Sequence, residues 1–426
     1  MGSKRVFMKG FVARWTADPG FWSLLDQAAV SAGNFIPAIL LARALTPSQY
    51  GIYALLFAVM LAMVSLYSAV IAYGLSVHGA AGTDAAVRPL AGGSLVLTTG
   101  GGIILGAATG LVAIPLHRVS LFPWIVLALL SWQLQETTRR SLMSRLRHRE
   151  AIWGDMVSYL GQSFCIACLF VFHRLSLSSA FQAMAATSAA AALLQSAQLR
   201  LRFSDFRGAR ALLLKFWNIG RWAVVANAIQ ALANQSLVWL LAVAGTEAVA
   251  SYQSLLNLVR VVNPVMFAIG GILLPTVAAQ QDKSHEGLRA ARRYGLLGAL
   301  VLLPYLTVVF LFPGTTLQLL YGAGSQYVGL GRELRILVLG SIFNYMTYVL
   351  GMYYYGLSRG AIVLCSGAVA ASLGVLGGLV LILQEGVLGA TIAYGLTFAA
   401  QAAALIWFLS RNVPAPSANR LGVAGL

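Results

Sequence analysis

Long apolar stretches recur along the chain, and each has about the length that a helix needs to cross the hydrocarbon of a bilayer. They fall at approximately residues 23–44, 52–75, 91–114, 122–142, 152–172, 178–199, 216–243, 248–275, 293–312, 332–356, 361–383 and 387–410. None shows the alternation of a β-strand, and a lipid-embedded segment must satisfy its backbone polar groups internally. The pattern predicts an all-α polytopic membrane protein with about twelve transmembrane helices.

The composition supports this fold class. Apolar residues make up 59% of the 426 residues and charged residues only 10%, and the mean hydropathy is +0.79. A soluble protein of this length needs more charge on its surface. The net charge of +17 does not indicate a nucleic-acid partner, because the basic residues lie in short runs between the apolar stretches.

The basic residues predict the orientation. Of the 29 Lys and Arg residues, 23 fall in one alternating set of connections and five in the other. Because Lys and Arg are retained on the cytoplasmic side, we expect both termini to be cytoplasmic. The first apolar stretch is long and interrupted by polar residues, so we expect a retained helix and not a cleaved signal peptide. The outer connections are short, the longest being about residues 313–331.

Two halves of the chain resemble each other. Trp22, Gln27 and Asn34 correspond to Trp222, Asn227 and Asn234 at an offset of 200. Halves with even numbers of spans share an orientation and can rock around a central cavity. We expect a cytoplasmic segment at 1–22, a six-helix half at 23–199, a basic linker at 200–215, a second six-helix half at 216–410 and a cytoplasmic tail at 411–426.

Polar side chains form stripes at helical spacing in the first spans of both halves, and these predict a wet, substrate-binding cavity. The expected lining residues are Gln27 and Asn34 in the first span, Asn227, Gln230 and Asn234 in the seventh, Gln253, Asn257 and Arg260 in the eighth, and Asn344 and Tyr348 in the tenth. The alternative is that these amides join helices to one another.

Arg260 and Asp26 are the most informative charges within the spans. A charge near the middle of a span costs about 2.5–3.5 kcal/mol on insertion scales, so it is usually paired or functional. Arg260 is therefore a candidate for substrate binding, or else for an ion pair with Asp26 or Glu136. Asp26 is the candidate coupling carboxylate, or a partner of a nearby Arg. Glu136 and Arg140 have the spacing of a structural pair within one helix.

The remaining reactive side chains predict neither a metal site nor an enzyme active centre. Cys165 and Cys168 form a C-x-x-C inside an apolar run, where packing is the expected role because a redox or zinc site needs accessible thiolates and further ligands. The histidines lack ligand spacing. We expect no catalytic residue, no metal and no cofactor, with H⁺ or Na⁺ as the candidate coupling ion.

Two runs near the N-terminus, residues 24–35 (LLDQAAVSAGNF) and 41–53 (LARALTPSQYGIY), resemble the start of polysaccharide flippases of the Wzx type. These belong to the multidrug/oligosaccharidyl-lipid/polysaccharide (MOP) superfamily, beside the MATE exporters. Shorter segments at 252–253, 258–260, 273–275 and 334–337 are similar to later parts of that family.

This resemblance implies a function. It implies the flipping of an undecaprenyl-diphosphate-linked oligosaccharide repeat unit to the outer leaflet of a bacterial inner membrane by alternating access, for surface polysaccharide synthesis such as O-antigen or exopolysaccharide. The implied partners are the lipid-linked oligosaccharide, membrane lipids, a polysaccharide polymerase and a chain-length regulator. The expected cationic cavity is best matched by Arg260.

Other classes remain open. A cation-coupled drug exporter of the same superfamily would need more buried carboxylates than the spans offer. A major-facilitator protein would carry a Gly-rich Asp-Arg-x-Gly-Arg-type loop after the second span, which residues 76–88 do not match. A polysaccharide polymerase or other membrane enzyme would need long outer loops with catalytic carboxylates or arginines.

Overall fold

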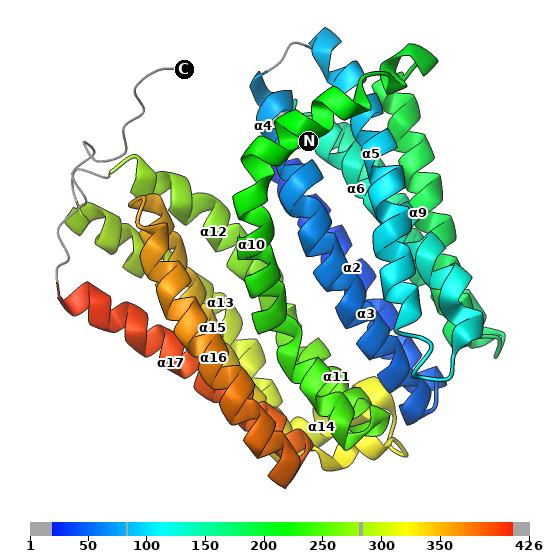
Figure 1. Ribbon diagram of the computed structural model, residues 1–426. Helices are drawn as coiled ribbons and strands as arrows, with labels where there is room; N and C mark the ends of the chain where they lie inside the picture. Colours follow the sequence, from blue (N-terminus) through cyan, green and yellow to red (C-terminus); the bar gives the residue numbers. More distant parts are fainter. Residues whose placement is uncertain (1–18, 82–83, 281–283, 412–426) are drawn as a thin grey trace, which may run out of the picture. The chain divides into compact units, whose positions relative to one another are not determined.

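The computed structural model describes residues 19–81, 84–280 and 284–411, and the regular structure in these ranges is helical (Figure 1). Every predicted span corresponds to a helix or to consecutive helical segments. These are α2 (Pro19–Ala44), α3–η1–α4 (Pro47–Tyr67, Ser68–Ala72, Tyr73–Ala81), α5 (Asp84–Leu111), α6 (Phe122–Met143), α7–η3–α8 (His148–Asp155, Met156–Leu160, Gly161–Val171), α9 (Leu177–Leu199), α10 (Ala209–Leu241), α11–η6–α12 (Thr246–Val259, Arg260–Val262, Asn263–Ala278), α13 (Ser284–Leu311), α15 (Gly331–Gly356), α16 (Gly360–Glu385) and α17 (Val387–Ser410).

Ten of these helices, within the described ranges, are both long and apolar enough to cross a membrane. The predicted spans that do not qualify are α6 and α10. Helix α6 has 22 residues, so its length suffices, but it carries a glutamate and two arginines. Helix α10 has 33 residues, several of whose side chains lie outside the described part of the structure, so that only Gln235–Ala244 remains there as a shorter apolar helix. The polytopic all-α class is confirmed.

The connections contain short helices that the sequence pattern does not predict. The outer connection at about 313–331 folds into α14 (Pro313–Tyr321) and a 3₁₀ turn, η7 (Gln326–Gly329). The basic linker contains the 3₁₀ turn η4 (Phe203–Phe206), which packs on α5. Gly92 of α5 permits this contact, because a Cβ at that position would overlap the backbone of Asp205.

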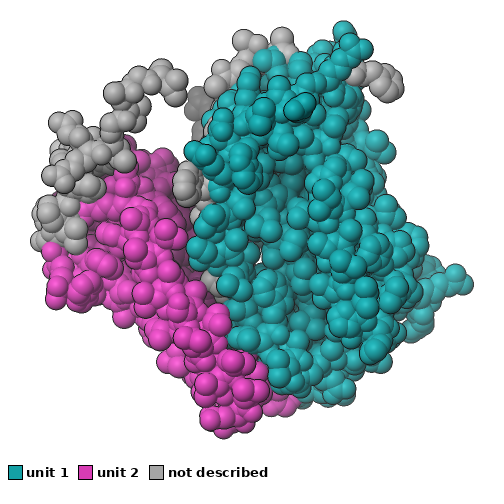
Figure 2. Space-filling model, in the orientation of Figure 1, with its two compact units in different colours: residues 1–261, 317–328 teal, residues 262–316, 329–426 magenta. Residues whose placement is uncertain are grey.

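The chain divides into two compact units. Unit 1 comprises Met1–Val261 and Leu317–Val328, and unit 2 comprises Val262–Thr316 and Gly329–Leu426 (Figure 2). The boundary falls inside the eighth predicted span, where η6 interrupts the α-helix between α11 and α12. The predicted six-helix halves concern a sequence repeat, which a division by contacts does not test, so they stay a prediction.

One contact within unit 1 joins two positions that the repeat makes equivalent. The first turns of α3 and α11 pack together, and the hydroxyls of Ser48 and Thr246 lie 3.0 Å apart. Gly51 allows this approach, since a Cβ there would overlap the Thr246 carbonyl group. The second helix of each predicted half therefore begins against its counterpart.

Candidate functional site

Helix α6 is the polar centre of unit 1. It packs against α3, α4, α5, α7 and α9, so protein and not lipid surrounds most of it. Its buried polar side chains are Ser131, Gln133, Gln135, Glu136, Thr137, Thr138, Arg139 and Ser141. Polar and ionisable side chains inside a membrane protein face the bundle interior, where partners offset their desolvation. This position explains why α6 is too polar to qualify as a lipid-facing span.

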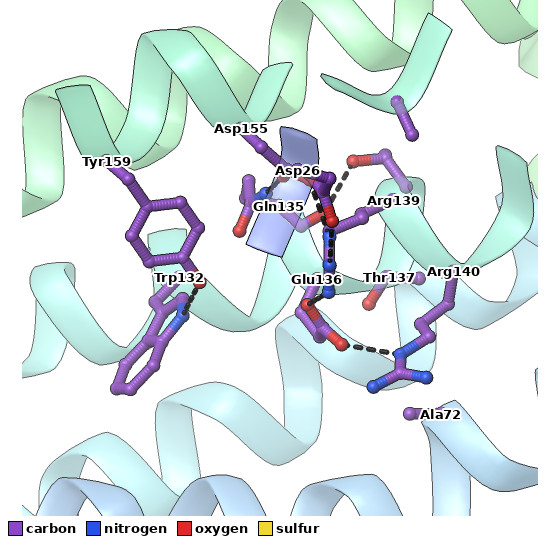
Figure 3. A network of polar contacts seen from close by, with 12 residues as sticks. Asp26, Ala72, Trp132, Gln135, Glu136, Thr137, Arg139, Arg140, Asp155 and Tyr159 are labelled. Carbon is purple, nitrogen blue, oxygen red and sulfur yellow. Dashed lines mark hydrogen bonds and ion pairs between the residues drawn. The ribbon is translucent and has the colours of Figure 1, made fainter. Parts of the chain in front are cut away.

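Arg139 lies at the centre of a buried ion network (Figure 3). Its Nη2 donates to Asp26 Oδ2 of α2 at 2.7 Å and its Nε to Asp155 Oδ2 of α7 at 2.7 Å. Its Nη1 donates to Glu136 Oε2 at 3.1 Å. Each guanidinium nitrogen therefore binds a different carboxylate, and one side chain joins three helices.

The network is buried and extends along α6. The side chain of Arg139 is 9% exposed, that of Asp26 1% and that of Asp155 0%. Arg140 Nε donates to Glu136 Oε1 at 2.5 Å, which confirms the predicted contact within α6. Gln135 Nε2 donates to Asp155 Oδ1 at 2.6 Å.

Close packing of α2 on the α7–η3–α8 segment brings the two aspartates together. Gly33 lies two helical turns after Asp26 on the same face, and Tyr159 lies one turn after Asp155. A Cβ at Gly33 would overlap the backbone and Cβ of Tyr159, so only glycine permits this separation. A π-helical turn, Met156–Leu160, begins directly after Asp155. Such turns are rare and occur frequently at functional sites.

The network holds one more acidic than basic group. Asp26, Glu136 and Asp155 face Arg139 and Arg140, which leaves one negative charge in excess when all are ionised. Two buried acceptors, Asp26 Oδ1 and Gln135 Oε1, have no hydrogen-bond partner. A buried charge or polar atom without a partner is costly. The cluster is therefore suited to taking up one cation, and a proton on a carboxylate is the smallest.

A second polar cluster lies in unit 1 where α3 meets α11. Gln253 Nε2 donates to Asn257 Oδ1 at 3.0 Å, and Asn257 Nδ2 donates to the Tyr50 hydroxyl at 2.8 Å. All three side chains are buried. Asn257 thus joins α11 to α3, which is the alternative that the pattern left open, whereas the hydrogen bond of Gln253 stays within α11. The role of both amides in lining a cavity stays a prediction.

Arg260 is the first residue of η6, directly after α11, and it is half-buried. Its guanidinium lies within electrostatic range of the Tyr50 hydroxyl. The carboxylates of Asp26 and Glu136, which were the alternative partners for Arg260, bind Arg139 and Arg140. Arg260 marks the break between α11 and α12, where unit 1 ends.

The other candidate residues are dispersed. Asn34 is exposed and donates to Val30 O of its own helix at 2.9 Å, and Gln27 is half-buried. Asn227 Nδ2 donates to Ser65 O at 2.9 Å, which joins α10 to α3. The side chains of Gln230 and Asn234 lie outside the described part of the structure.

Asn344 and Tyr348 belong to unit 2. Asn344 Nδ2 donates to the Tyr394 hydroxyl at 3.3 Å, between α15 and α17. The Tyr348 ring meets Phe267 edge to face, with centroids 6.2 Å apart. Both residues therefore contribute to packing within their unit, and their contact with a substrate stays a prediction.

The sequence interpretation did not identify Arg139 and Asp155 as site residues. The 23 basic residues that the sequence analysis counts in cytoplasmic connections include Arg139 and Arg140, and the structure corrects this count by placing both inside α6. The available signal was the position of three acids, Asp26, Glu136 and Asp155, inside predicted spans of a chain with only 12 acidic residues. Acids in spans require basic partners nearby. Across the described ranges, no group of three or more His, Cys, Asp or Glu residues is arranged to hold a metal ion.

Solved structures of membrane transporters share the fold. An inward-facing MATE-family multidrug resistance transporter of the MOP superfamily superposes with a TM-score of 0.74 at 16% identity, covering 91% of this chain and 98% of that one. The lipid II flippase MurJ, in an inward closed conformation, gives a TM-score of 0.72 at 10% identity over 92% of this chain and 87% of that one. The eukaryotic MATE transporter AtDTX14 gives 0.66 at 13% identity over 93% and 96%.

These likenesses show the fold, which is that of MATE/MOP transporters, and their identities are too low to show more. No protein-family model matches the sequence, and no curated protein matches it.

Proposed function

We propose that this protein is a flippase that moves an undecaprenyl-diphosphate-linked oligosaccharide repeat unit from the cytoplasmic to the outer leaflet of a bacterial inner membrane. The observation that carries the proposal is the fold, which is shared along nearly the whole chain with transporters that include a lipid II flippase. The resemblance of residues 24–35 and 41–53 to Wzx-type flippases supports the choice of substrate.

The proposed substrate is an anion, and the charge of the chain suits it. Arg260 lies at a helix break and is half-buried, and a guanidinium binds phosphate oxygens in a planar two-point arrangement. Three buried acids of unit 1, Asp26, Glu136 and Asp155, are already bound to arginines. Only one negative charge of this cluster is left without a basic partner, which offers a cationic drug little attraction.

We propose that Asp26 is the carboxylate that couples transport to an ion, H⁺ or Na⁺. It is buried, it carries an oxygen without a hydrogen-bond partner, and it contacts Arg139 of another helix. Changing its charge would alter the contact between α2 and α6. A bound ion can shift a conformational equilibrium only if it binds the two conformations with different affinity, and a contact that depends on the charge of Asp26 can provide that difference.

The proposal is tested by deleting the gene and following the lipid-linked intermediates. We expect complete repeat units to form, to accumulate on undecaprenyl diphosphate in the cytoplasmic leaflet and to be absent from surface polymer. Expression of the full chain in the deletion strain should restore the polymer. If lipid-linked units fail to form, the protein acts in synthesis and the proposal is wrong.

A cation-coupled drug exporter is the second candidate, because MATE multidrug transporters share the fold. The same deletion strain separates the two. A deletion that leaves surface polymer and lipid-linked intermediates unchanged but raises sensitivity to cationic drugs would favour export.

A further inference from the structure

We propose that Arg139 is a built-in counter-cation that excludes Na⁺ from the Asp26–Asp155 site, so that the proton is the ion this site takes. The inference rests on the proposed coupling role of Asp26 and names the ion for it. It concerns a binding property of unit 1 that is measured without transport.

Arg139 already occupies the position that an alkali ion would take. The guanidinium of Arg139 lies where oxygens of three carboxylates converge, and each of its nitrogens is bound to one of them. An alkali ion needs several oxygen ligands around one point, and here the guanidinium holds that point. The side chain is held on all sides, because α6 is enclosed by its neighbours.

The charges around the site also favour a proton over Na⁺. The ionisable groups around the site are Asp26 on α2, Tyr67 on α3, Glu136, Arg139 and Arg140 on α6, Asp155 on α7 and Tyr159 on η3. With the tyrosines neutral, one negative charge is in excess. One proton removes this excess and needs no additional space. A sodium ion would have to share the site with a guanidinium of the same sign, which costs energy in a poorly solvated interior.

Two unpartnered oxygens in the site favour a proton as well. Asp26 Oδ1 and Gln135 Oε1 are acceptors without a donor. A proton held by the Asp26–Asp155 pair supplies the O–H donor that these acceptors lack. Figure 3 shows Asp155 and Gln135 beside Asp26, so that a carboxylate and an amide oxygen lie nearby as acceptors. The local hydrogen bonding therefore favours a proton, which donates, over a metal ion, which does not.

The alternative is that Arg139 only holds three helices together. This role predicts that Arg139→Gln lowers stability and that all salts act alike on the variant. Our proposal predicts in addition that the vacated position binds Na⁺. The two roles of Arg139 are therefore distinguished by whether Na⁺ specifically stabilises the variant, and not by how much stability the variant loses.

The experiment measures Tm of the purified full-length protein in detergent, with NaCl replaced stepwise by choline chloride at constant ionic strength. We expect the wild type and Arg139→Lys to be insensitive to Na⁺. We expect Arg139→Gln to have a lower Tm that rises saturably with Na⁺, by at least about 2 °C. Adding Asp26→Asn to Arg139→Gln should abolish this rise, because it removes a ligand.

Two further variants separate charge from occupancy. Arg140→Gln leaves the same excess charge as Arg139→Gln but keeps the guanidinium at the centre, so we expect no response to Na⁺. The double variant Glu136→Gln/Arg139→Gln has the excess charge of the wild type but a vacant centre, so we expect stabilisation by Na⁺. The double variant also provides a protein with a vacant centre if Arg139→Gln alone does not fold.

A saturable effect of Na⁺ on wild-type Tm that Asp26→Asn abolishes would overturn the proposal. So would an absence of any Na⁺ response in both vacated variants. Failure of the flippase proposal would leave these melting curves unchanged, whereas failure of the present inference would leave the gene-deletion result unchanged, so the two failures are distinguishable.

Discussion

At the scale of single residues, the two arginines of interest have different surroundings. Arg139 is bound by three carboxylates, so its positive charge is neutralised inside unit 1. Arg260 is half-buried at the end of α11, where a polar cluster and a helix break adjoin it. Its place at a helix break beside this polar cluster makes Arg260 the candidate for contact with an anionic substrate.

Replacement of Arg260 tests this assignment. We expect Arg260→Ala and Arg260→Gln to abolish surface polymer at near-normal protein levels, and Arg260→Lys to retain part of the activity because it keeps the charge without the planar fork. Arg332→Ala, at an exposed position of α15, is the control and should behave as wild type. Normal polymer from Arg260→Ala, or restoration of polymer by neutralising Asp26 or Glu136, would argue against substrate binding.

The Tyr50 hydroxyl gives a second residue-scale prediction. It accepts a hydrogen bond from Asn257 at 2.8 Å in a buried position. Tyr50→Phe removes the acceptor of the Asn257 Nδ2 group, while Asn257 Oδ1 still accepts from Gln253. The buried N–H left unpaired should lower the free energy of unfolding by about 1–3 kcal/mol. Thermal unfolding of the purified protein measures the effect, with Tyr355→Phe at an exposed position as the matched control. Equal Tm values for the two variants would show that the hydrogen bond contributes no stability.

At the scale of helices, the sequence predicted well which segments are helical and how long they are, because a segment that crosses the bilayer must be a helix of a certain length. Every predicted span matches a helical segment, including α6, whose hydropathy alone fails to identify it. The site was less accessible to prediction. Asp26 and Arg139 are 113 positions apart, and their contact depends on how α2, α6 and α7 pack. No periodicity within one helix reports such packing, and the π turn after Asp155 has no sequence signal that we recognise.

Gly33 is the packing position on which the aspartate pair depends. Gly33→Val would place two methyl groups against Tyr159, and overpacking of this kind costs about 1–3 kcal/mol. We expect a lower Tm and loss of transport, because α2 is displaced from α7 and from Arg139. The control is Gly101→Ala in α5, where a Cβ meets nothing within 4 Å, and where alanine should be neutral or raise Tm slightly. An unchanged Tm for Gly33→Val would contradict the close approach.

At the scale of the whole molecule, a repeat in sequence and a division by contacts describe different things. The predicted halves divide the chain near residue 200, whereas the compact units divide it at Val261 and Val262 and return residues 317–328 to unit 1. Sequence similarity records common descent of helices, while contacts record one arrangement of them. The equivalence of helices that matching polar positions such as Asn34 and Asn234 predict is therefore not tested by which helices pack together.

The expected orientation of the whole chain depends on its basic residues, and the structure removes two of them from the loops. Arg139 and Arg140 lie inside α6 and bind buried carboxylates, so they do not count as loop charges. The remaining cytoplasmic set still far exceeds the five basic residues of the opposite set. Asp26, Arg139 and Asp155 also lie toward the ends of their helices that the alternation assigns to the cytoplasmic side, and the structure brings them together.

We therefore expect both termini in the cytoplasm, and reporter fusions test this expectation. A phosphatase that is active only outside the cytoplasm should be inactive when fused after Leu426 or after Arg200, and active when fused after His117, which follows α5. A reporter that is active only in the cytoplasm should give the reverse pattern at the same three positions. Because positive loop charges determine orientation, Arg200→Ala together with Arg202→Ala should not suffice to invert the chain while the other basic connections remain. Phosphatase activity at Leu426 with inactivity at His117 would show that the topology is the reverse of the one expected. A proton would then reach Asp26 from the opposite side of the membrane.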